Sequence, residues 1–114
     1  MIDLNQLLNE AAFQTTFKKQ KELLATEFAD ACVMAHGGGI FDLTPEFLAG
    51  LEFRNSHSTE NKLWVIDRNQ TCILITDVTA FLLQAAAVYQ AAIEHYGTEW
   101  NKLRTKRSTK SLVQ

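Results

Sequence analysis

Apolar residues recur at three- and four-residue steps along the first third of the chain, which has no proline or glycine between Asp3 and His36. This spacing predicts a long amphipathic helix with Asp3 as its N-cap. The β-branched pair Thr15-Thr16 coincides with a phase slip of the apolar stripe and could divide the helix in two. Gly37-Gly38-Gly39 is expected to end it, because glycine readily adopts the left-handed conformation of a C-cap.

The next segment changes pattern several times within a short length. Residues 40–43 alternate between apolar and polar and predict a short strand. The sequence Thr44-Pro45-Glu46 supplies an N-cap, a first-turn proline and an acid, so we expect about one helical turn that ends at Gly50. Residues 51–54 are expected to form a second short strand, and the polar residues 55–61 a surface loop.

A β-hairpin is predicted over residues 62–76, where two runs rich in β-branched and aromatic residues flank Arg68-Asn69-Gln70. Asn69 is expected to take the positive-φ position of the turn. Successive side chains of a strand point to opposite faces, so both faces of this hairpin are expected to be apolar. One face is predicted to carry Trp64, Ile66, Ile73 and Ile75, and the other Leu63, Val65, Cys72 and Leu74.

A second long helix is predicted after Asp77, which is its expected N-cap. The stripe keeps a three-four rhythm to at least Arg104, although Gly97 could kink the helix or end it near Tyr96. The fold class is therefore α+β: a long N-terminal helix, a short antiparallel sheet that includes the hairpin, and a long C-terminal helix. The length of 114 residues fits one domain, residues 1–104, followed by a basic and flexible tail, residues 105–114.

The net charge of −2 conceals an uneven distribution. Residues 1–101 carry six basic and thirteen acidic side chains, whereas the C-terminal segment adds five bases and no acid. This segment could fold back on the acidic body, bind an acidic protein surface, or make salt-sensitive contacts with nucleic acid. The electrostatic residues are Lys102, Arg104, Lys106, Arg107 and Lys110.

A small sheet with two helices leaves apolar side chains exposed to solvent unless another surface packs on them. Either the helices enclose the sheet, or another protein chain completes an apolar face. Small residues in Ala85-Ala86-Ala87 are compatible with both close packing within the chain and helix association. Under the second alternative, the candidate interface residues are Trp64, Tyr89, Tyr96, Phe41 and Phe47.

No motif indicates an enzyme, a cofactor or a metal. Cys32 and His36 would lie four residues apart on one helix face, but no CxxC, HxxxH or HExxH motif accompanies them. The glycine triplet lacks the lysine and hydroxyl residue of a phosphate loop. Acidic residues are scattered rather than paired, and Cys32 and Cys72 are expected to be reduced thiols. We therefore predict no catalytic residues and no small-molecule substrate.

The segments WVIDRNQTCILITD and DVTAFLLQAAAVYQAAIEHY resemble small proteins encoded by tailed bacteriophages, over residues 62–104. The resemblance implies a virion, connector or tail-assembly component present in several copies, or an inhibitor that binds a host protein. The partners would be other protein chains, with nucleic acid a less favoured alternative. The chain lacks a run of about 18 apolar residues, and its start lacks the positive charge of a signal peptide, so we expect the host cytoplasm or a virion.

Overall fold

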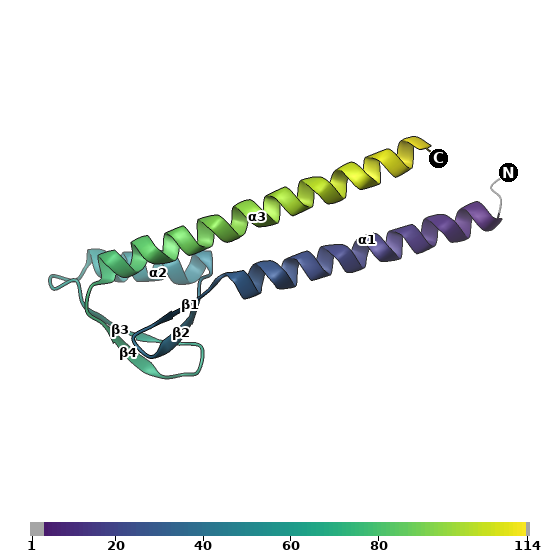
Figure 1. Ribbon diagram of the computed structural model, residues 1–114. Coiled ribbons are helices and arrows are strands. Elements are labelled where there is room, and N and C mark those ends of the chain that lie inside the picture. Colours follow the sequence, from purple (N-terminus) through teal and green to yellow (C-terminus); the bar gives the residue numbers. More distant parts are fainter. Residues whose placement is uncertain (1–3, 114) are drawn as a thin grey trace.

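The computed structural model describes the backbone of residues 4–113 and the side chains of residues 4–106 (Figure 1). In the sequence, two long helices flank two β-hairpins and a shorter helix, which confirms the predicted α+β fold. The expected N-cap, Asp3, lies outside the described residues. In chain order the elements are α1 (Leu4–Ala31), β1 (Val33–His36), β2 (Gly39–Asp42), α2 (Pro45–Ser56), β3 (Leu63–Ile66), β4 (Cys72–Ile75) and α3 (Val78–Val113).

The molecule has an extended shape with two distinct parts. Its extents are 70 × 24 × 20 Å, and its radius of gyration is 20.7 Å, whereas a compact chain of this length would have about 13 Å. Figure 1 shows the cause: α1 and α3 lie side by side in opposite directions and project from the strands. We call α1 together with residues 88–113 the arm, and residues 32–87 the head.

The first helix is continuous but shorter than predicted. Thr15 and Thr16 do not break it, since their hydroxyls donate to the Ala11 and Ala12 carbonyls at 3.0 Å. The expected continuation to His36 is wrong: α1 ends at Ala31, and the next residues pair with β2 as strand β1. Gly37 and Gly38 take positive φ values of 58° and 86° and form the turn of this hairpin. Pairing between strands therefore replaces the last helical turn.

The segment after Thr44 is a single helix rather than one turn followed by a strand. The Thr44 side chain accepts from the Phe47 amide at 3.0 Å, which confirms the N-cap, but α2 runs through Gly50 to Ser56. The predicted strand at residues 51–54 is wrong, since these residues belong to α2. Leu51 is 3% exposed and lies one helical turn from the half-buried Phe47 and Leu48. This three-four spacing matches a helix face that packs against the core.

The β3–β4 hairpin forms where it was predicted, but its side chains are divided between the two faces differently from the prediction. Leu63 lies opposite Ile75, and Val65 opposite Ile73, so these four residues share the inner face. The other face carries Trp64, Ile66, Cys72 and Leu74. The β3 residues are therefore grouped as predicted, but the predicted assignment of the β4 residues to the two faces is wrong. The five residues between the strands set this register, and Gln70 rather than Asn69 has positive φ, at 63°.

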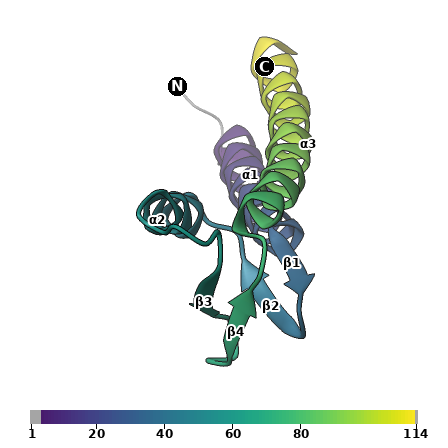
Figure 2. The ribbon, with the colours of Figure 1, turned by 90° about the vertical axis from the view of Figure 1, so that its left-hand side faces the viewer.

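The core lies in the head, where the inner faces of both hairpins and of α2 meet the first turns of α3 (Figure 2). Asp77 caps α3 as predicted, since its Oδ1 accepts from the Ala80 amide at 3.0 Å. The helix passes through Gly97 without ending. The largest fully buried side chains are Phe41, Phe81, Leu43, Ile75 and Val78.

Aromatic contacts join the two helices of the arm. The Phe28 ring stacks on Tyr96, with 4.9 Å between ring centroids, and meets Tyr89 edge-on at 5.9 Å. Farther along the arm, Phe17 meets Trp100 edge-on at 6.4 Å. These contacts form a seam, and the α1 residues on it are Phe13, Phe17, Leu24 and Phe28, which are buried or half-buried.

Candidate protein-binding surfaces

The predicted interface residues occupy very different environments. Phe41 is 1% exposed and contacts the rings of Phe47 and Phe81, so the expectation that it lies at the surface is wrong. Phe47 is half-buried in the same cluster. Tyr89 and Tyr96 are half-buried against Phe28, and they therefore serve the contact between α1 and α3. Of the five candidates, Trp64 alone has a largely exposed side chain, with 59% of its surface accessible.

Trp64 belongs to an apolar surface that the register creates. Trp64 pairs with Leu74, and Ile66 pairs with Cys72, so these four side chains project from one side of the hairpin. We call them the outer hairpin face. Ile66 is 61% exposed and Leu74 is 40% exposed. Sequence reasoning missed both as surface residues, although the number of residues in the turn would have given the register and hence the face.

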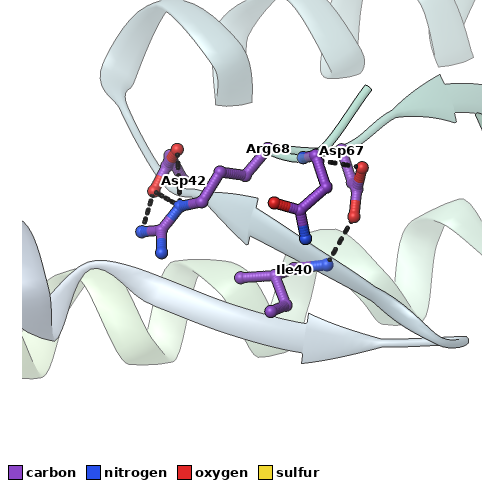
Figure 3. Close-up of polar contacts among 5 residues, drawn as sticks. Ile40, Asp42, Asp67 and Arg68 are labelled. Atoms are coloured by element: carbon purple, nitrogen blue, oxygen red, sulfur yellow. Dashed lines mark hydrogen bonds and ion pairs between the residues drawn. The ribbon is translucent and has the colours of Figure 1, made fainter. Parts of the chain in front are cut away.

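A polar network fixes the hairpin that carries this face (Figure 3). Asp67 accepts hydrogen bonds from the amides of Ile40, Asn69 and Thr71 at 3.0, 3.0 and 2.8 Å. The first of these bonds joins the β3–β4 turn to strand β2. The Ile40 carbonyl completes the link by accepting from the Arg68 amide at 2.8 Å. The carboxylate thus holds its own turn and the neighbouring hairpin at the same time.

The network also controls the charge state of its acids. The Ile40 amide, followed by that of Thr71, lowers the pKa of Asp67, because donors stabilise the carboxylate. Asp42 forms an ion pair with Arg68, whose Nε lies 3.0 and 3.2 Å from the two carboxylate oxygens. This hydrogen bonding holds the pKa of Asp42 below its usual value. Both acids remain charged at neutral pH, and the link between the hairpins persists there.

The cysteines differ in access. Cys72 is exposed on the outer hairpin face, whereas Cys32 is buried, and burial raises the pKa of the Cys32 thiol. His36 lies on β1 rather than on α1, so the expectation that Cys32 and His36 share a helix face is wrong. Among the described residues, no group of three or more His, Cys, Asp and Glu side chains could hold a metal ion.

The basic segment continues α3 to Val113. Lys102 pairs with Glu99 at 3.1 Å, and the Arg104 guanidinium lies 5.4 Å from the Trp100 ring centroid. Lys106 is exposed. The side chains of Arg107 and Lys110 lie outside the described residues. The flexibility of residues 105–114 remains a prediction.

Small residues on α3 allow α1 and the strands to pack closely. Ala85 is fully buried in the core, and Ala92 is 7% exposed. Next to Ala92, an apolar groove of about 390 Å³ opens between α1 and α3, with Glu27 and Glu99 among its lining residues. Ala86, Ala87 and Ala91 remain exposed. Close packing within the chain therefore explains Ala85 and Ala92.

No helix among the described residues has the length and hydropathy needed to cross a bilayer. No protein-family model, curated protein or solved structure was found to match this chain.

Proposed function

We propose that this chain acts without catalysis, by binding other proteins through the outer hairpin face. The exposure of Trp64, Ile66 and Leu74 on one fixed hairpin carries this proposal. Contiguous exposed apolar side chains mark interaction sites, and tryptophan is enriched among the residues that dominate binding energy. A partner that covers this face would find it preformed, since Asp67 and Arg68 hold the hairpin against β2.

The size of the face is sufficient for the centre of an interface. Full burial of a large apolar side chain contributes about 1.5–3 kcal/mol. Weighted by the exposed fractions of 59%, 61% and 40%, burial of Trp64, Ile66 and Leu74 contributes about 2–5 kcal/mol. Contacts around this centre would have to offset the cost of association, so the partner should extend beyond the hairpin.

The most specific form of the proposal is a structural or assembly component of a tailed bacteriophage. The resemblance of residues 62–104 to small phage proteins supports this role, and so does an extended chain that presents an apolar face at one end. A phage-encoded inhibitor of a host protein is the alternative role for the same surface. The two roles differ in copy number, because a structural component is built into every particle.

Quantitative mass spectrometry of purified particles and of infected-cell extracts distinguishes them. A structural component should be present at a fixed number of copies per particle, and Trp64→Ser with Ile66→Ser should reduce its incorporation at least about tenfold. Phe53→Ser is the matched control, since Phe53 is 66% exposed on α2 and outside this face. Absence from particles, together with accumulation in the cell, would exclude the structural role and favour the inhibitor.

Cys72 provides a direct reporter of the same surface. Its thiol is exposed on the outer hairpin face, whereas Cys32 is buried. Maleimide should therefore label Cys72 in the isolated chain and leave Cys32 unlabelled until the protein unfolds. Inside particles, labelling of Cys72 should fall sharply. Equal labelling in both preparations would show that the partner binds elsewhere.

A further inference from the structure

A second apolar surface lies on the arm, far from the outer hairpin face. At 3.6 residues per turn, the first apolar residues of α1 centre about 150° away from the seam that packs on α3. Leu4, Leu7 and Leu8 are accordingly 67%, 53% and 58% exposed. The phase slip near Thr15 thus reflects two stripes on one continuous helix. Within the chain, α3 covers the seam and leaves the stripe that contains the leucines open.

This open stripe continues along the whole of α1 at alternating four- and three-residue steps, the spacing of a helix-pairing surface. Every residue on it is exposed. We call it the outer α1 face, and it consists of Leu4, Leu8, Ala11, Thr15, Lys18, Glu22, Ala25 and Ala29. The large side chains lie at its beginning and the small ones at its end. If two such faces met in opposite directions, each leucine would lie against an alanine.

The charge of the arm also has a direction. Its free end, residues 4–19 and 100–106, carries five basic side chains and one acid, Glu10. The part of the arm next to the head, residues 20–31 and 88–99, carries five acidic side chains and one basic side chain, Lys21. Two arms that overlap in opposite directions place the basic free end of each arm beside the acidic part of the other. Parallel arms would place like charges together, which is unfavourable.

We propose that the outer α1 face binds the same face of a second copy of this chain, antiparallel and about a twofold axis. The overlap of residues 4–29 is about 39 Å long. In this register Leu4 lies opposite Ala29 of the second copy, Leu8 opposite Ala25, and Ala11 opposite Glu22. Lys18 and Glu22 fall near the middle, where their long side chains can reach solvent. This surface is separate from the outer hairpin face, which remains free to bind another protein.

Leu8→Gln tests the surface, and Leu23→Gln is its matched control. Leu8 and Leu23 are 58% and 59% exposed on the same helix, but Leu23 lies off the outer α1 face. We expect a dimer by light scattering at about 50 µM, and Leu8→Gln should raise its dissociation constant at least about tenfold, because symmetry removes two leucine contacts. Leu23→Gln should leave it within about twofold. Circular dichroism should show equal helix content in all three proteins.

Directed disulfides test the orientation, in a background in which Cys72 is replaced by serine. A mixture of an Ala11→Cys chain and a Glu22→Cys chain should form the heterologous disulfide, since these positions face each other in the antiparallel dimer. Ala11→Cys alone should not link to itself, because the two copies of residue 11 lie about 16 Å apart along the axis. Cross-linking tests the orientation better than salt dependence does. Lys18 and Lys19 of both copies lie near the twofold axis and repel each other, so salt would weaken this repulsion together with the attraction between the ends of the arms.

Three results would overturn the proposal. A wild-type chain that is monomeric at about 100 µM excludes the dimer. Equal loss of dimer in Leu8→Gln and Leu23→Gln excludes the outer α1 face. Preferential linkage of Ala11→Cys to itself, or no linkage in the mixture, excludes the antiparallel arrangement.

Discussion

Gly39→Ala tests whether the hairpins depend on a close approach between β2 and the β3–β4 hairpin. A methyl group on Gly39 would lie 2.8 Å from Cγ1 of Ile73 and 3.3 Å from Cβ and Oδ2 of Asp67. Carbon atoms prefer separations of about 3.5–4.0 Å, so this methyl would overlap its neighbours. They cannot move cheaply, because Ile73 is β-branched and Asp67 is held by three backbone amides.

The size of the effect follows from two opposing contributions. An additional methyl group in a packed site costs about 1–3 kcal/mol. Alanine also restricts the unfolded chain, which returns about 0.4–1 kcal/mol where the native backbone tolerates it. We therefore expect a net loss of about 1–2 kcal/mol. For a chain of this size, this loss lowers the melting temperature by roughly 4–8 °C.

Gly50→Ala is the control, because it is the same substitution in open space. Gly50 lies within α2, and apart from its chain neighbours and the backbone of its own helix no atom would lie within 4 Å of the added methyl group. Alanine is the better helix former, so this variant should gain about 0.5–1 kcal/mol. Urea denaturation followed by circular dichroism measures both variants. A Gly39→Ala protein as stable as the wild type would refute the argument that the hairpins are clamped at this contact.

Three other perturbations test separate parts of the molecule. The pKa of Asp67 is lower in the folded than in the unfolded chain, so its contribution is complete above about pH 4 and is lost as the pH falls through the folded value. Asp67→Asn should lower the melting temperature at pH 7 and flatten its decline below about pH 4, and an unchanged pH profile would contradict this role. Phe28→Ala removes the ring contacts with Tyr89 and Tyr96 and should cost about 2 kcal/mol, with faster amide hydrogen exchange in the arm than in the head. A chain that ends after Thr105 keeps the buried Leu103 and should melt within a few degrees of the wild type. The intact protein should not shift duplex DNA at about 0.15 M salt, and a shift that the truncation abolishes would favour nucleic-acid binding.

Features with a strong local signal were predicted correctly from the sequence. Residues 62–76 form a hairpin because β-branched runs flank a short turn, and Asp77 begins a helix because its carboxylate caps the Ala80 amide. Pro45 likewise marks the start of α2. In each case the residues that decide the structure are close together in the sequence, so the pattern contains the necessary information.

The errors arose where distant residues decide the outcome. The residues after Ala31 leave the helix because they pair with β2, and α2 continues past Gly50 because Leu51 reaches the core. The error in the candidate surface has a different cause. Trp64 and Ile66 were predicted on one face, as the structure has them, but Leu74 was assigned to the opposite face, because the register across the turn decides which residues of the second strand join that face.

The position of the arm has a consequence for how the chain acquires its structure. The contact between Phe17 and Trp100 joins residues near opposite ends of the sequence, so forming it from an open chain requires closure of a very large loop. Once the hairpins and α3 have assembled, Phe28 and Tyr89 are already neighbours, and each further pair closes only a short distance. We therefore expect the arm to zip from the head outward. During synthesis, α1 emerges before α3 and cannot pack until α3 is made, so its leucines stay open to chaperones or to a neighbouring nascent copy throughout that interval.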